Sequence, residues 1–111
     1  MKNRRLLNHA MLATLMVAMI AFSAAHAEGD VSAGRTKSIP CMGCHAIPGY
    51  SNVYPTYHVP RVGGQHPEYI VAALKAYKDK QRSHPTMQAQ ASSLSDQDMQ
   101  DIAAFFAANP E

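Results

Sequence analysis

The sequence predicts a small all-α domain with three main helices and long loops. Three segments carry the spacing of amphipathic helices, and no segment shows the period-two alternation of a strand. The stretches between them are rich in proline and glycine. The part of the chain that follows a predicted leader is also near the size at which a core needs a metal, staple or cofactor. The predicted fold class is therefore all-α around a group that completes the core.

Residues 1–27 form the predicted secretory signal peptide, with cleavage expected after Ala27. Lys2, Arg4 and Arg5 make a positive start, an apolar stretch runs through residues 10–22, and Ala25-His26-Ala27 has the small-residue pattern of a cleavage site. An uncleaved anchor is the alternative, although the apolar stretch is short for a membrane span. Residues 28–111 are then the mature domain, and a periplasmic location is expected.

Removal of the leader also changes the charge balance. Three of the ten Lys and Arg residues lie in the leader, so seven remain against eight Asp and Glu, and the net charge is −1. Nucleic-acid binding requires an extended positive surface. We therefore expect no nucleic-acid partner.

The first helix is predicted from Val31 to about Ser38, with Asp30 as its N-cap. Pro40 is expected to interrupt it just before Cys41. Residues 46–66 contain several prolines and glycines, and their apolar residues follow neither helix nor strand periodicity. This predicts a long connection, which the wrapping of a cofactor would explain.

A second helix is predicted to begin at Pro67, and its apolar face consists of Tyr69, Ile70, Ala73, Leu74 and Tyr77. Residues 81–93, QRSHPTMQAQASS, are predicted as a second loop. Ser95 is the expected N-cap of the last helix, whose buried face consists of Met99, Ile102, Ala103, Phe105 and Phe106.

The stretch CMGCH at residues 41–45 carries the chemistry. A disulfide switch of the thioredoxin kind needs a βαβ pattern around the two cysteines, and none is predicted. A zinc site needs two further ligands, and the histidines that follow lack the usual paired spacing. Covalent haem uses the whole motif, because both thiols bond to the porphyrin and the adjacent imidazole faces the iron. One covalently bound haem c is therefore predicted, with Cys41 and Cys44 as tethers and His45 as the proximal iron ligand.

The residue on the other face of the iron decides the chemistry. Met42 lies inside the attachment motif, and Met99 lies on the apolar face of the last helix, where a core role is expected. Met87, in the second loop, is the favoured distal ligand. His58, His66 and His84 compete with it, and His84 is the strongest of the three because it lies nearest to Met87.

Residues 29–107 resemble the class I c-type cytochromes, in particular the small soluble bacterial monohaem type (cytochrome c-553-like). The resemblance rests on CMGCH, VPRVGGQHPEYI at 59–70, RSHPTM at 82–87 and LSDQDMQDIAAFFA at 94–107. It implies the cytochrome c fold, thioether bonds at Cys41 and Cys44, and axial ligation by His45 and Met87. It also implies that Pro60, Val62 and Tyr69 line or brace the haem pocket. Ala46 and Pro40 depart from the usual pattern around the motif, and neither removes a ligand.

An iron held by both His45 and Met87 has no vacancy for a substrate, which predicts an electron carrier rather than an enzyme. The expected partners are redox proteins, a donor and an acceptor that include membrane respiratory complexes, and no small-molecule substrate is expected. One alternative is an open or labile sixth site, which would give a peroxidase-like enzyme or a small-gas binder. Another is a haem subunit of a larger oxidoreductase. The cations Lys75, Lys78, Lys80 and Arg82 are either a docking patch or a solvated face.

Overall fold

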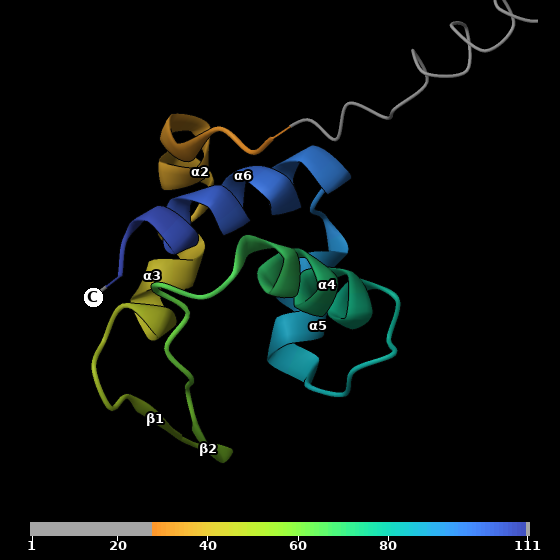
Figure 1. Ribbon diagram of the computed structural model, residues 1–111. Helices are drawn as coiled ribbons and strands as arrows, with labels where there is room; N and C mark the ends of the chain where they lie inside the picture. Colours follow the sequence, from red (N-terminus) through yellow and green to blue (C-terminus); the bar gives the residue numbers. More distant parts are fainter. Residues whose placement is uncertain (1–27, 111) are drawn as a thin grey trace, which may run out of the picture.

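The computed structural model describes residues 28–110, so the predicted leader lies outside the described residues. Figure 1 shows a mainly helical domain with a short two-stranded hairpin at one end. The elements are α2 (Val31–Lys37), α3 (Ile39–His45), β1 (Ser51–Val53), β2 (Thr56–His58), α4 (Pro67–Lys78), α5 (Pro85–Ser92) and α6 (Asp96–Ala108). Within residues 28–110, no helix combines the length and the apolar character that crossing a membrane requires.

The first predicted helix is confirmed, but Pro40 does not act as expected. Asp30 caps α2, where its Oδ1 accepts a hydrogen bond from the Ala33 amide at 2.9 Å. A second short helix, α3, follows directly and contains Pro40 in its first turn. Proline is tolerated there because the first turn leaves its N–H groups unpaired in any case. The whole CMGCH motif is consequently helical.

The prediction that the domain has no strand was wrong. β1 and β2 pair in antiparallel register, with Ser51 opposite His58 and Val53 opposite Thr56. Each strand has only three residues, which is too short for a period-two pattern to stand out in the sequence. Val53 and Tyr54 lie at the turn, 84% and 93% exposed.

Residues 81–93 were predicted as a loop, and this was also wrong in part. Residues 85–92 form helix α5, with His84 as the N-cap and Pro85 in the first turn. Ala91 is its only buried residue, so the segment has no apolar stripe that would reveal a helix. The described part of the chain therefore has five helices rather than three.

The core lies where α4, α5 and α6 meet. Its buried side chains are Ile70, Val71, Leu74, Ala91, Met99, Ile102, Ala103 and Phe106. Met99 is fully buried, as predicted, and Ser95 forms a capping box with Asp98 at the start of α6. Tyr69, in contrast, does not belong to the buried face of α4, because it is 53% exposed.

Helix α2 packs closely across α6, and ion pairs connect the two helices. Gly34 permits the approach, because a Cβ at this position would lie 1.9 Å from the Asp101 carbonyl oxygen. Lys37 Nζ lies 2.6 Å from Asp101 Oδ2 and 2.8 Å from Asp98 Oδ1. Asp101 is only 3% exposed, and its Oδ1 also accepts from the Asp30 amide at 2.8 Å. This buried carboxylate was not expected on the apolar face of the last helix.

Candidate functional site

The two cysteines lie on one face of α3. They are three residues apart, so they are neighbours on the helix surface. Both are free thiols and both are half-buried. Burial raises the pKa of the Cys41 thiol, and the nearby Cys44 raises it further. Because the thiolate is the nucleophilic form, this shift makes Cys41 less reactive than an ordinary cysteine.

His45 is the last residue of α3, and its ring is held in place by the backbone. Its Nδ1 donates a hydrogen bond to the Pro60 carbonyl oxygen at 2.7 Å. Because a carbonyl can only accept, the bond assigns the proton to Nδ1 and leaves Nε2 with a free lone pair. A hydrogen bond of this kind is the usual support of a metal-ligating histidine.

The site does not have the composition of a zinc centre. Within residues 28–110, no three His, Cys, Asp or Glu side chains are grouped so that they could hold a metal ion. Among the described residues, Cys41 and Cys44 therefore lack the partners that would complete a tetrahedral zinc site.

Met87 is carried by α5, where it is half-buried and packs against the core. Its backbone amide donates to His84 Nδ1 at 3.4 Å. The His84 ring is also packed edge-on against Tyr57, at 4.6 Å between centroids, and more loosely against Tyr77, at 6.5 Å. One ring nitrogen of the strongest competing ligand thus already serves as the helix cap.

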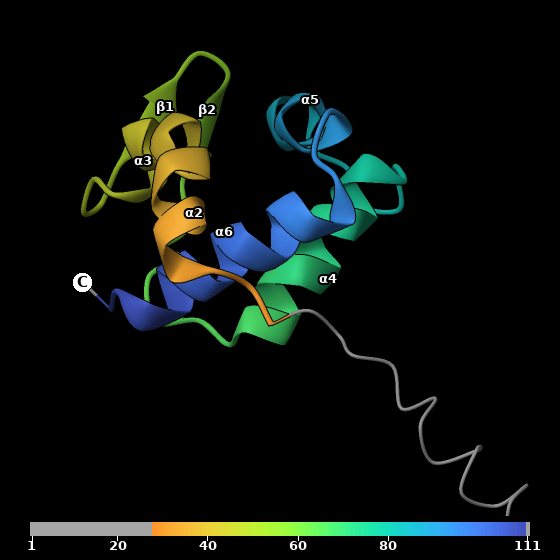
Figure 2. The same ribbon diagram turned by 90° about the horizontal axis from the view of Figure 1, so that it is seen from above.

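The helices that carry these residues lie on opposite sides of the fold. Figure 2 shows α3 and the hairpin on one side and α5 on the other, with α6 and α4 below them. No Cα atom of α3 lies within 8 Å of a Cα atom of α4, α5 or α6. The two sides are linked by Tyr57 of β2, whose hydroxyl lies 3.3 Å from Thr86 Oγ1 of α5.

Helix α3 packs against the core only through the half-buried side chains of Cys41 and Met42. None of its residues is buried, and Ile39 is 61% exposed. A seven-residue helix is not stable by its own hydrogen bonds. A flat apolar group bonded to Cys41 and Cys44 would extend this limited packing, and the imidazole and thioether donors suit a haem iron. The residues present fit a covalent haem.

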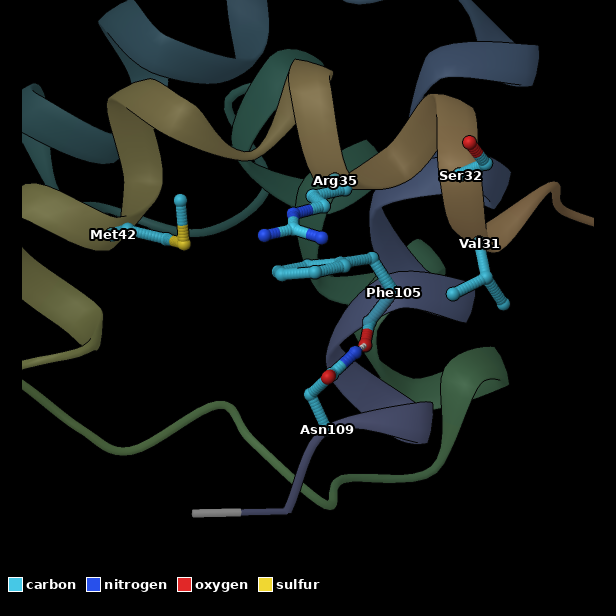
Figure 3. Close-up of a pocket in the computed structure, with 6 residues that line it drawn as sticks. All are labelled: Val31, Ser32, Arg35, Met42, Phe105 and Asn109. Carbon is cyan, nitrogen blue, oxygen red and sulfur yellow. Dashed lines mark hydrogen bonds between the residues drawn. The ribbon is translucent and has the colours of Figure 1, made fainter.

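A separate groove lies between α2, α3 and the C-terminal part of α6 (Figure 3). Its volume is about 590 Å³, and its lining residues are Val31, Ser32, Arg35, Met42, Phe105 and Asn109. Met42 is the only lining residue from the CMGCH motif. No residue of α5, the helix that carries Met87, lines this groove.

Comparison with known proteins identifies the family. The family model described as cytochrome c matches residues 36–109. The chain belongs to the cytochrome c family. Cytochrome c-554(548) of Halomonas halodenitrificans is 38% identical over 81 residues, which cover 70% of this chain and 94% of that protein. Membership of this family implies a covalently bound haem c.

Longer relatives match as well. Cytochrome c4 of Pseudomonas aeruginosa is 36% identical over 97 residues, which cover 87% of this chain but 47% of that protein. The chain thus spans about half the length of the cytochrome c4 relatives it matches. A solved structure of cytochrome c4 from Acidithiobacillus ferrooxidans superposes with a TM-score of 0.56 at 23% identity, over 75% of this chain and 52% of the other. This likeness confirms the predicted cytochrome c fold.

The three residues that the resemblance places around the pocket have different surroundings. Pro60 holds His45 through its carbonyl oxygen. Val62 is half-buried and packs against the core. Tyr69 accepts a long hydrogen bond of 3.4 Å from Arg82 at the surface of α4. Only Pro60 is thus seen to support a predicted ligand directly, and it acts through its backbone, which every residue type provides.

Two supporting residues were missed at the level of sequence. Tyr57 and Thr86, which are 29 residues apart in the sequence, connect the hairpin to α5. No local sequence pattern predicts such a contact. The cap at His84 does have a signal, because Pro85 follows it at a position that favours the first turn of a helix.

Proposed function

We propose that this chain is a periplasmic electron carrier that holds one haem c, with Cys41 and Cys44 as thioether tethers and His45 and Met87 as axial ligands. The observation that supports this best is the placement of α3 and α5 on opposite sides of the fold, with no Cα pair between them within 8 Å. Haem c, when bound, supplies the one-electron Fe(III)/Fe(II) couple, and histidine–methionine ligation raises its potential. The predicted leader and the extracytoplasmic attachment of haem c support the periplasmic location.

Neighbouring groups of the chain hold both proposed ligands in position. The Pro60 carbonyl fixes the His45 ring and its tautomer, so that Nε2 is the ligating atom. Met87 is held by its packing against the core and by the cap at His84. Ligands held in this way keep the same geometry in both oxidation states, which lowers the rearrangement that accompanies electron transfer. The partners proposed for this role are a donor and an acceptor protein.

The absorption spectrum tests the proposal. The full-length chain is produced in a bacterium that matures c-type cytochromes, and the purified protein is expected to be coloured and low-spin. A methionine sulfur on ferric haem gives a charge-transfer band, and Met87→Leu should abolish it. Met42→Leu is the matched control and should keep the band, because Met42 lies between the tethers.

Two results would contradict the proposal. A colourless protein that still folds would rule out the covalent haem. A high-spin ferric protein that binds added ligands freely would instead favour the open sixth site of a peroxidase-like enzyme or a gas binder.

A further inference from the structure

The groove of Figure 3 combines apolar and polar side chains in an open position. Val31, Met42 and Phe105 supply apolar surface, and Ser32, Arg35 and Asn109 supply polar groups. Met42 and Phe105 are half-buried, whereas the other four residues are exposed. Such a groove is shallow enough to accept side chains from another protein.

Arg35 gives the groove its charge. Within residues 28–110 its guanidinium has no hydrogen-bond or ion-pair partner, and Figure 3 shows it beside the Phe105 ring. Lys37 on the same helix is different, because Asp98 and Asp101 already neutralise it. No described residue therefore occupies the fork of N–H donors of Arg35, and a carboxylate matches that fork best.

The cations of residues 75–82 are less available. Lys78 Nζ donates to the Leu94 carbonyl oxygen at 2.5 Å, and Lys75 Nζ lies 3.6 Å from Asp96. Arg82 lies over the Tyr77 ring, 4.9 Å from its centroid. Three of the four cations once considered as a docking patch thus have contacts within the molecule, which makes Arg35 the better anchor for a partner.

Met42 connects the groove with the proposed redox centre. It lies one residue from Cys41 and two residues from Cys44. A partner that touches Met42 would be separated from the proposed tethers by very little covalent structure. This step rests on the proposed function.

We propose that the groove is a docking site for a redox partner protein, which places an acidic side chain on Arg35 and an adjacent apolar side chain against Phe105 and Met42. Electron-transfer complexes have small interfaces that form and separate quickly. One exposed cation in a small apolar groove suits such a contact, because the charge orients the partner and adds little affinity.

A peptide titration followed by NMR tests the docking chemistry on the intact protein. The probe is acetyl-Glu-Phe-Glu-Phe-amide, and its matched control is acetyl-Gln-Phe-Gln-Phe-amide. The acidic peptide is expected to shift the signals of Arg35, Met42 and Asn109. The control should bind up to about fivefold more weakly, which corresponds to an exposed ion pair of about 1 kcal/mol.

Charge-neutral variants locate the anchor. Arg35→Gln should weaken binding of the acidic peptide to the level of the control, whereas Lys80→Gln, the loss of an exposed cation elsewhere, should not. Equal binding of the two peptides, equal effects of the two variants, shifts confined to residues 75–82, or no saturable shift at low-millimolar peptide would each overturn the proposal.

Oxidation by hexacyanoferrate(III) supplies the redox readout. The reduced protein loses one electron and the anion gains it to become hexacyanoferrate(II). Arg35→Gln should lower the bimolecular rate severalfold at low ionic strength and more than Lys80→Gln does, and the difference should vanish at high salt. Equal rates would overturn docking at the groove. Loss of haem or of the Met87 band in the unmodified protein would instead contradict the proposed function, and the peptide titration would still decide the docking.

Discussion

At the scale of single residues, His84 shows how one side chain can support a ligand without being one. Its Nδ1 accepts from the Met87 amide, so the neutral ring carries its proton on Nε2. Tyr57 and Tyr77 pack against the same ring from two other elements. His84 therefore joins the start of α5 to the hairpin and to α4, and the position of Met87 depends on it.

Replacement of His84 separates this capping role from a role as an iron ligand. His84→Asn keeps a good N-cap acceptor and should retain the Met87 charge-transfer band. His84→Ala loses the acceptor, and we expect it to lower the free energy of unfolding by about 1 kcal/mol and to weaken the band. Absorption spectra and thermal unfolding measure the two effects. A retained band and an unchanged melting temperature in the alanine variant would contradict the capping role.

Asp101 is the second residue whose surroundings decide its behaviour. The Lys37 ammonium and the Asp30 amide hold the pKa of this carboxyl below its usual range, and Gln97 adds a further hydrogen bond. The Lys37 ammonium also lowers the pKa of Asp98, with help from Ser95. Because unfolded aspartates titrate near pH 4, unfolding takes up protons in acid. The stability from these pairs is thus present above about pH 4 and is lost as the pH falls toward the folded pKa values.

Asp101→Asn should remove part of this acid dependence. Near neutral pH, the free energy of unfolding of the variant is expected to be about 1–3 kcal/mol lower than that of the unmodified protein. The reason is that Lys37 and the Asp30 amide keep only a neutral acceptor. The difference in the free energy of unfolding between the variant and the unmodified protein should become smaller below about pH 4, where the wild-type carboxylate becomes protonated. Urea unfolding across this pH range measures both. A gap that stays constant with pH would show that the Asp101 charge does not contribute.

At the scale of the elements, the crossing of α2 and α6 depends on the absence of a side chain. A Cβ on Gly34 would meet the backbone of Asp101, which cannot rotate away as a side chain would. Gly43 on α3, in contrast, has open space around such a Cβ beyond its own chain neighbours and the backbone of its helix. The two glycines differ in packing but share a helical position.

Alanine at each glycine isolates the effect of close packing. Both substitutions gain up to about 1 kcal/mol of helix propensity, so their difference reports the clash. Gly34→Ala should be less stable than Gly43→Ala by about 1–3 kcal/mol, the usual consequence of overpacking. Chemical denaturation of the haem-loaded proteins measures the difference. Equal stabilities would mean that α2 can shift on α6 without loss.

At the scale of the whole molecule, the buried core is one-sided. It consists of side chains from α4, α5 and α6, whereas α3 contributes no buried residue. The side of the molecule that carries CMGCH is held by α2, by the His45–Pro60 bond, by the Tyr57–Thr86 contact and by the half-buried Cys41 and Met42. A bound haem would add further apolar contacts to this side.

A double substitution of the tethers tests this dependence. One packing defect typically costs about 1–3 kcal/mol. We expect Cys41→Ser/Cys44→Ser to lower the free energy of unfolding by more than this. Hydrogen exchange should show loss of protection in α3 and the hairpin before α4 and α6. Uniform protection in a haem-free variant would contradict the proposed part of haem in the fold.

Much of the fold was predictable because its signals are local. Asp30 and Ser95 each cap a helix through the amide of the residue three positions further on, and Pro67 begins α4 where its missing N–H is harmless. The burial of Met99 follows from helical spacing. The hairpin and α5 were not predicted, because three-residue strands and a polar helix have no periodicity that a sequence can display.

By itself the sequence determined the helix starts, the CMGCH motif, its resemblance to the class I c-type cytochromes and the predictions of Cys41, Cys44, His45 and Met87 as haem residues. Tertiary contacts alone separate α3 from α5, orient His45 through a backbone carbonyl and bury Asp101 beside Lys37. The physical reason is the distance along the chain. Caps and periodic faces arise between near neighbours, whereas these contacts join residues that only packing brings together.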